Sequence, residues 1–309
     1  MEGIVVKSVG SSYFVTLTDG RTVDCKLKGV FRIRGLKATN PVAVGDRVTL
    51  QESERDGGNV ITKIHDRRNY IIRKSTKLSK AVHIIAANID QAILVVTMAY
   101  PRTSTGFMDR FLVTAEAYKI PVHIVFNKCD LHIEEVDEMV REVSEMYERI
   151  GYPCMNVSAL EGTGIEELAQ LMKGKTSLFA GHSGVGKSAL ANALEPGLEL
   201  RTDDLSTFSM KGKHTTTFAE MYHLSFGGFL IDTPGIKEFG LVDFYKEELT
   251  HYFPEMFALL TQCKYHNCTH TGEPDCAVVR AVDAGEIHPL RYQNYLNIYF
   301  GREFDETEN

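Results

Sequence analysis

Residues Gly181–Ser188 read Gly-His-Ser-Gly-Val-Gly-Lys-Ser and fit the phosphate-binding pattern Gly-x-x-x-x-Gly-Lys-Ser/Thr. The apolar run Thr176–Ala180 before them predicts a buried strand, and Ala189–Leu194 after them predicts a helix. A phosphate loop requires a strand before it and a helix after it, and the alternative is a glycine-rich turn that only joins this strand to this helix. The flanking pattern therefore favours a phosphate loop.

The chemistry of such a loop gives its residues specific roles. Backbone N–H groups of the turn and of the helix N-terminus point at anionic oxygens, and the Lys187 ammonium neutralises charge on the β- and γ-phosphates. The Ser188 hydroxyl is the expected Mg²⁺ ligand. The His182 side chain, inside the loop, is expected to be structural rather than catalytic. The residues predicted to bind the nucleotide phosphates are Gly181, His182, Ser183, Gly184, Val185, Gly186, Lys187, Ser188 and Ala189.

The chain before and after this loop alternates between apolar runs and helical patterns. Such alternation predicts a parallel sheet covered by helices on both faces, which is an α/β fold. Before the loop, strands are expected at Gln91–Thr97, Val122–Phe126 and Met155–Ser158, and helices at Met108–Tyr118, Glu134–Ile150 and Ile165–Met172. After the loop, strands are expected at Phe218–Ser225 and Gly228–Ile231.

Two polar stretches at predicted strand ends are suited to reading a guanine base. Asn127-Lys-Cys-Asp130 follows one strand, and Ser158-Ala159 ends the next. The Asp130 carboxylate can accept from the N1–H and the N2 amine of guanine, which adenine lacks, so a kinase or ATPase is disfavoured. Asn127 would support the base edge and the Lys128 stem would cover the ring. The backbone of Ser158 and Ala159 would contact the guanine oxygen.

Two later stretches predict the segments that sense the γ-phosphate. His214-Thr-Thr-Thr217 ends a long polar segment, and Asp232-Thr-Pro-Gly235 follows a predicted strand. Asp232 would hold Mg²⁺ through water, while the Gly235 amide contacts the γ-phosphate. We choose Thr216 as the threonine that completes the magnesium shell and so takes part in catalysis.

The order of these motifs predicts a circularly permuted GTPase. The guanine-reading stretches precede the phosphate loop, whereas in Ras-like proteins they follow it, and moving the termini to another surface connection preserves the core of a doubly wound sheet. Ile236 stands where Ras-like enzymes carry the glutamine that orients the attacking water. Because an aliphatic side chain cannot hydrogen-bond to water, we assign that role to His214. Contact of His214 with RNA or solvent is the alternative.

Residues 1–66 predict a small β-barrel of the oligonucleotide-binding (OB) type, because five short strand-like runs are separated by turn residues. The basic loop Lys28–Asn40 lies where such barrels carry a binding loop, and Arg67–Lys74 leads out as a basic linker. The expected strands are Gly3–Val9, Tyr13–Leu17, Thr22–Leu27, Arg47–Gln51 and Asn59–Ile64.

Charge is unevenly distributed along the chain. The 309 residues carry a net charge of −7, yet residues 1–80 contain 16 Lys and Arg against 8 Asp and Glu. A solvated charged surface is one explanation, but an excess over a whole candidate domain favours an anionic partner such as RNA. No apolar run approaches the roughly 20 residues that cross a bilayer, and the N-terminus lacks a signal-peptide core. We therefore expect a cytoplasmic protein without membrane contact.

Cys263-x₄-Cys268-x-His270-x₅-Cys276 has the composition of a structural zinc site, since three thiolates and one imidazole fill a tetrahedral shell. The spacing alone also allows His266 as the fourth ligand, and reduced cysteines without metal are the alternative. The surrounding helices need more packing than they supply alone, so zinc would fix them. These helices are expected at Lys246–Thr261, Asp275–Ala284 and His288–Phe300, before an acidic tail, Glu303–Asn309, that we expect to fray.

The combined motifs resemble the circularly permuted bacterial family of small-ribosomal-subunit-dependent GTPase A. The resemblance covers nearly the whole chain and implies an OB-fold RNA-binding domain at residues 1–68, a permuted α/β P-loop GTPase domain at 69–240 and a helical zinc-binding domain at 241–309. It also favours His270 over His266 as the zinc ligand.

This resemblance implies that GTP is hydrolysed to GDP and phosphate with Mg²⁺ during late maturation of the small ribosomal subunit. The particle and its rRNA would bind the protein and stimulate hydrolysis. The alternative is an RNA-binding assembly adaptor whose guanine nucleotide is structural. A monomer is the simplest state for a protein with so asymmetric a partner.

Overall fold

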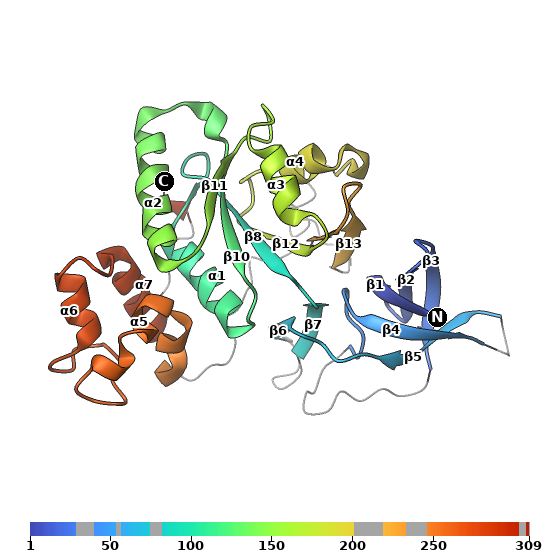
Figure 1. Cartoon of the computed structure of the whole chain (residues 1–309), viewed down its shortest axis with the longest axis horizontal. Coiled ribbons are helices and arrows are strands. Elements are labelled where there is room, and N and C mark those ends of the chain that lie inside the picture. The colour runs from blue at the N-terminus through green and yellow to red at the C-terminus, as the bar shows by residue number, and fades with distance from the viewer. Residues whose placement is uncertain are drawn as a thin grey trace.

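A computed structural model describes residues 1–28, 40–53, 57–74, 82–200, 219–232, 246–302 and 307–308. Figure 1 shows a small barrel formed by the N-terminal strands, a central sheet flanked by helices, and a cluster of short helices from the C-terminal part of the chain. The α/β fold with an N-terminal barrel is therefore confirmed.

The five strands of the barrel close on themselves because β1 pairs with both β2 and β4, while β5 joins β3 to β4. Alternate side chains, such as those of Val5 and Ile61, point inward and are fully buried. The predicted strands are confirmed within one residue at each end. Their bounds are β1 Glu2–Val9, β2 Ser12–Leu17, β3 Thr22–Leu27, β4 Arg47–Glu52 and β5 Asn59–Ile64.

The central sheet has the order β11-β10-β8-β12-β14-β13. All its pairings are parallel except that of β13, which runs antiparallel to β14 and also pairs with β1 of the barrel. The parallel strands are nearly continuous apolar runs, as expected for strands covered on both faces. Their bounds are β8 Gln91–Val96, β10 Val122–Asn127, β11 Cys154–Val157, β12 Thr176–Ala180, β13 Glu220–His223 and β14 Phe229–Asp232.

Four helices cover this sheet, two on each face. Helices α1 (Thr105–Ala117) and α2 (Glu134–Ile150) share one core with Leu94 of β8, whereas α3 (Ile165–Met172) and α4 (Lys187–Leu194) share the other core with Ile93. The neighbouring strand residues Ile93 and Leu94 face opposite sides because side chains alternate along a strand. The four helices confirm the predicted alternation.

The predicted basic linker forms structure instead. Strand β6 (Tyr70–Lys74) pairs antiparallel with β7 (Val82–Ala87), which the sequence reasoning did not identify as a strand. The basic residues at both ends of Arg67–Lys74 are typical of an exposed linker, but the centre of this stretch is apolar and Ile71 is buried. Figure 1 places this pair of strands between the barrel and the central sheet.

The turn Val44-Gly45-Asp46 docks the barrel against the end of β7. Val44 forms an isolated bridge with Ala86, and Gly45 has a φ of +87°, a left-handed conformation that favours glycine. A Cβ atom on Gly45 would lie 2.0 Å from the Ala87 carbonyl oxygen. The buried Asp46 carboxylate accepts two bonds of 2.6 Å from the Arg67 guanidinium, so an ion pair secures the same corner.

Replacing Gly45 with alanine is expected to lower stability by more than about 2 kcal/mol, because left-handed strain of about 1–2 kcal/mol adds to displacement of the Ala87 carbonyl. Gly57→Ala is the matched control, since Gly57 has a φ of +65° with nothing within 4 Å of the added Cβ. It should cost only the strain, about 1 kcal/mol. Thermal unfolding of both variants measures the difference, and equal melting temperatures would contradict the docking role of Gly45.

The C-terminal helices are shorter than expected. The predicted helix Lys246–Thr261 is divided into three parts, because Pro254 has no N–H to continue the hydrogen bonding of a preceding helix. Residues Thr307–Glu308, expected to fray, pair as β15 with β9 (Arg102–Thr103). The elements are the 3₁₀ helices η4 Lys246–Tyr252 and η5 Leu260–Gln262 and the α-helices α5 Pro254–Phe257, α6 Ala277–Asp283 and α7 Pro289–Phe300.

Candidate nucleotide site and metal centre

The predicted nucleotide-binding residues gather at the carboxyl ends of the parallel strands. Asn127 ends β10, Ser158 follows β11, Gly181 follows β12 and Asp232 ends β14. In open α/β sheets ligands bind outside this edge, where loops from neighbouring strands converge. The fold therefore brings together four stretches that are far apart in the sequence.

The phosphate loop depends on its glycines for close backbone approach. Gly181 and Gly186 have φ values of +141° and +92°, and an added Cβ would lie 2.1 Å from the Val95 carbonyl oxygen and 2.4 Å from Asn127 Nδ2, respectively. Lys187 is buried at the start of α4, and its ammonium donates to the Gly181 carbonyl at 2.8 Å. The loop thus places a cation and a helix N-terminus at one point, which suits an anionic ligand.

Asn127 connects the phosphate loop to both guanine-reading stretches. Its Nδ2 donates to the Val185 carbonyl at 2.8 Å, and its Oδ1 accepts from the Ala159 N–H at 3.2 Å. Asn127 is 7% exposed, so these bonds are shielded from water and fix three loops in one arrangement. Its contact with a base edge stays a prediction.

The Asp130 carboxylate is oriented by a neighbouring hydroxyl. Ser158 Oγ donates to Asp130 Oδ1 at 2.5 Å and accepts from the Glu161 N–H at 3.0 Å. Lys128 has a left-handed backbone, and its ammonium donates to the Tyr100 carbonyl at 2.5 Å. Burial lowers the pKa of Lys128, although Asp130 opposes this effect. A carboxylate and the stem of a lysine are therefore presented beside the phosphate loop.

Two contacts at this site involve residues that no motif marks. The Phe107 ring of α1 packs on the buried His182 imidazole of the phosphate loop, with the ring centroids 3.6 Å apart. Tyr100, whose carbonyl accepts from Lys128, is 74% exposed in the loop before α1. The sequence offers no signal for either contact, because both depend on how β8 and α1 pack against the loop.

The structure describes only some of the residues that are predicted to contact Mg²⁺ and the γ-phosphate. Ser188 is buried in the first turn of α4, and Asp232 is partly buried at the end of β14. Three other predicted residues, His214, Thr216 and Gly235, lie outside the described residues.

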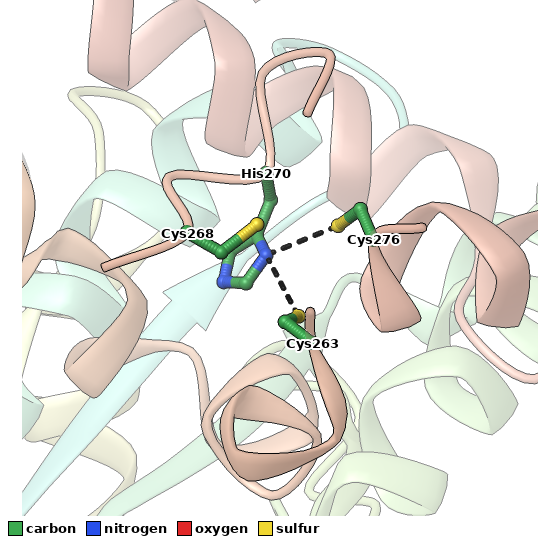
Figure 2. A group of neighbouring side chains, drawn as sticks. All are labelled: Cys263, Cys268, His270 and Cys276. Carbon is green, nitrogen blue, oxygen red and sulfur yellow. Dashed lines mark hydrogen bonds between the residues drawn. The ribbon is translucent and has the colours of Figure 1, made fainter. Parts of the chain in front are cut away.

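The four predicted metal ligands meet in one cluster (Figure 2). His270 Nδ1 lies 3.7 Å from Cys263 Sγ and 3.2 Å from Cys276 Sγ, and one ligand atom from each of the four residues lies within 4.8 Å of the others. A tetrahedral zinc ion with Zn–S bonds of about 2.3 Å separates its ligand atoms by roughly 3.6–3.8 Å. The spacing and the donor types therefore fit zinc. His266, the other histidine allowed by the spacing, is exposed and outside this cluster.

The surroundings of the cluster support a closed structural site. His270 is fully buried, and burial raises the pKa of Cys268 to about 12, so the protein alone disfavours the thiolate that a metal requires. A divalent cation would reverse this preference by direct coordination. Tyr292 of α7 donates to the His270 carbonyl at 2.7 Å, and Glu273 accepts from the backbone N–H groups of the same loop.

No helix among the described residues combines the length and the apolar character that crossing a membrane demands.

Comparisons with known proteins agree with this geometry. Residues 64–242 match the RsgA GTPase family, and residues 2–60 match the RsgA N-terminal domain. A protein of Bacteroides fragilis named Small ribosomal subunit biogenesis GTPase RsgA is 52% identical over 98% of this chain and 97% of its own length. A protein of the same name from Flavobacterium psychrophilum is 53% identical over 99% of this chain and 94% of its own length.

Two solved structures are similar over almost the entire chain. The crystal structure of YjeQ from Thermotoga maritima has a TM-score of 0.80 and 40% identity, with 97% of each chain covered. YloQ, described as a circularly permuted GTPase, has a TM-score of 0.75 and 30% identity, with 97% of this chain and 94% of YloQ covered. From the matching family model, the near full-length identity and the shared permuted fold, it follows that this chain is a member of the RsgA GTPase family.

Proposed function

We propose that this chain hydrolyses GTP to GDP and phosphate and that it acts in late maturation of the small ribosomal subunit. The observation that carries the proposal is the pair of Asn127 hydrogen bonds, to Val185 of the phosphate loop and to Ala159 of the guanine-reading stretch. A site that only bound phosphate would not need the two stretches to be fixed to each other. The relatives named for small-subunit biogenesis support the biological role.

The proposed site assigns each group a specific interaction. Asp130 accepts from the guanine N1–H and N2 amine, Lys187 neutralises the β- and γ-phosphates, and the backbone of Gly181–Ala189 surrounds them. Ser188, Thr216 and the Asp232 carboxylate would hold Mg²⁺, which neutralises negative charge on the phosphates when bound. Cys263, Cys268, His270 and Cys276 would hold one structural zinc ion.

The basic N-terminal region supports rRNA as the partner. Residues 1–80 carry the basic excess, and the barrel strands β1–β5 that lie within them form a fold of a type that binds oligonucleotides. We propose a monomer of the bacterial cytoplasm, with RNA-contacting residues at 1–68, the GTPase domain at 69–240 and the zinc domain at 241–309.

The second candidate function is an RNA-binding adaptor whose nucleotide stabilises its shape without turnover. The buried Lys187 and Ser188 at the loop favour catalysis, but a motif does not measure a rate. Phosphate release from GTP by the purified protein separates the two candidates. The protein alone should turn over at about 10⁻⁴–10⁻² s⁻¹, in the range of unassisted GTPases, and small subunits should accelerate it strongly.

Large ribosomal subunits are the control in this assay. Stimulation by small subunits alone supports the GTPase proposal. Tight binding to small subunits without any stimulation of phosphate release would favour the adaptor instead.

His214→Ala is expected to remove the stimulated turnover while preserving GTP binding, because we propose that the imidazole positions the attacking water in place of the absent glutamine. Loss of one water-positioning group typically costs about 10²–10⁴-fold in rate. Phosphate release with small subunits measures the loss, and a fluorescent GTP analogue measures binding. Thr215→Ala is the control from the same stretch. Wild-type stimulation in the His214 variant would eliminate the proposed role.

A further inference from the structure

A buried polar network joins the C-terminal helices to helix α1 of the central sheet. Arg291 of α7 is 1% exposed, donates to the Asp109 carboxylate of α1 at 2.5 Å and donates twice to Glu255 of α5. The same Asp109 carboxylate accepts from Asn294 of α7 at 2.7 Å and from the Tyr147 hydroxyl of α2 at 2.6 Å. Three donors from two directions therefore converge on one fully buried carboxylate.

This network holds α1 and α7 together strongly. Burial alone would lower the pKa of Arg291, but Asp109 and Glu255 raise it above its usual value, so the guanidinium is charged. Its Cζ also lies 4.5 Å from the centroid of the Phe253 ring. Separation of α1 from α7 would leave a charge buried without its partner, which is strongly unfavourable.

Helix α7 also carries the side chains that brace the metal-ligand loop. Tyr292, adjacent to Arg291, donates to the carbonyl of the ligand His270 at 2.7 Å. Tyr295, one turn further on, donates to the Thr269 carbonyl at 2.7 Å. The metal-ligand loop and α1 are therefore attached to the same helix, within two turns of each other.

The first turn of α1 reaches the phosphate loop. Its N-cap residue Ser104 accepts from the Phe107 N–H, and the Phe107 ring packs on His182 at a centroid distance of 3.6 Å. The His182 carbonyl in turn accepts from the Lys187 ammonium at 2.5 Å. Because Asp109 lies only two residues after Phe107, the position of the ring depends on how α1 is held by α7.

We propose that the C-terminal helical module, which comprises η4, α5, η5, α6 and α7 (residues 246–300) and contains the four proposed zinc ligands, positions the phosphate loop through α1. Arg291 and Asp109 fix the helix, and Phe107 transmits its position to His182; all three act as positioning residues, without contact to the nucleotide. The inference rests on the proposed binding of nucleotide phosphates by Gly181–Ser188. If the inference holds, loosening the helical module accelerates nucleotide release, although the metal cluster lies among the C-terminal helices and the phosphate loop belongs to the central sheet.

Asp109→Asn and Glu255→Gln form a matched pair that tests this inference. Each change removes the charge of one carboxylate partner of Arg291. Asp109 lies in α1, so its change weakens the connection between α1 and α7, whereas Glu255 lies in α5, within the helical module. The measurement is the dissociation rate of a fluorescent GDP analogue from the full-length, zinc-loaded protein. Asp109→Asn should raise this rate by roughly 3- to 30-fold, the range of coupling that packed networks transmit, and Glu255→Gln by less than about twofold.

Phe107→Leu tests the contact between the Phe107 ring and His182 and leaves the buried network of Arg291 and Asp109 intact. It should raise the GDP dissociation rate by a similar factor, while Phe107→Tyr keeps the ring and should restore the parent rate. Combining Asp109→Asn with Phe107→Leu should add little to either single change, because both act through the same contact. Zinc chelation should accelerate release from the parent protein but not further from Phe107→Leu.

Several outcomes would overturn the inference. Equal rates for Asp109→Asn and Glu255→Gln would mean that α1 has no special role. A parent-like rate in Phe107→Leu would mean that the contact of Phe107 with His182 does not affect nucleotide release. If Asp109→Asn does not fold, the Phe107 variants and the chelation experiment still decide the question. Absence of GDP binding by the parent chain would instead refute the proposed function.

Discussion

Asp130→Asn is expected to lower the affinity for GTP by about 10⁴-fold and to create a preference for xanthosine nucleotides. The carboxylate accepts from two guanine donors, and a buried site that leaves such groups unpaired rejects a ligand by about 10⁴–10⁵-fold at the favourable limit. Asparagine replaces one acceptor with an N–H donor, which suits the xanthine oxygen that stands where guanine has its amine. Competition between GTP and XTP for a fluorescent GDP analogue measures the change.

The surroundings of Asp130 make this variant easy to interpret. Ser158 Oγ donates to Asp130 Oδ1 at 2.5 Å, and the side-chain oxygen of asparagine can accept the same bond. The loop should therefore keep its conformation. Asp137→Asn is the matched control, because it makes the same change on the exposed surface of α2. Retention of full GTP selectivity by the Asp130 variant would show that another group reads the base.

Much of this architecture could be predicted because its signals are local. The strands of the central sheet are apolar runs, and the guanine-reading stretches and phosphate loop directly follow such runs. Because parallel strands align their carboxyl ends, placing a motif after a strand also places it at the site. The metal cluster was predictable for a similar reason, since its four ligands lie within 14 residues of one another in the sequence.

Features that depend on packing were not predictable in the same way. Asp109 and Arg291 are separated by 182 residues, and each occupies a helix whose sequence does not reveal that a charged residue faces the core. Phe107 looks like an ordinary apolar helix residue, and only the assembled fold brings its ring to His182. Charged residues are usually exposed, so the sequence pattern of α7 would place Arg291 on the surface, whereas the structure buries it beside its carboxylate partners.

The break within Lys246–Thr261 has a different cause. Apolar residues at helical spacing predicted one helix, yet the chain forms η4, α5 and η5. Pro254 begins α5 at a position where its missing N–H is not needed, and the preceding residues turn as a 3₁₀ helix. Apolar residues of this segment, such as Leu249 and Met256, are buried, but the prediction of one continuous helix was wrong.

The second large effect is expected from removal of one metal ligand, with two histidines of the same loop as a matched pair. His270→Ala should abolish zinc retention, whereas His266→Ala should keep about one ion per chain, because His270 Nδ1 faces two thiols and His266 is exposed. Zinc binding supplies about 10–16 kcal/mol in small structural sites, so its loss should release the C-terminal helices from their native packing.

Metal content after dialysis and limited proteolysis together measure this outcome. The His270 variant should be cleaved rapidly between the helices that follow residue 246, while the barrel and central sheet, which have separate cores, stay resistant. If His270→Ala retained zinc and His266→Ala lost it, His266 and not His270 would be the fourth zinc ligand. Equal protease resistance of the parent and the zinc-free variant would mean that the packing of Phe253, Tyr295 and Ile298 suffices to hold these helices, and that the metal serves another purpose.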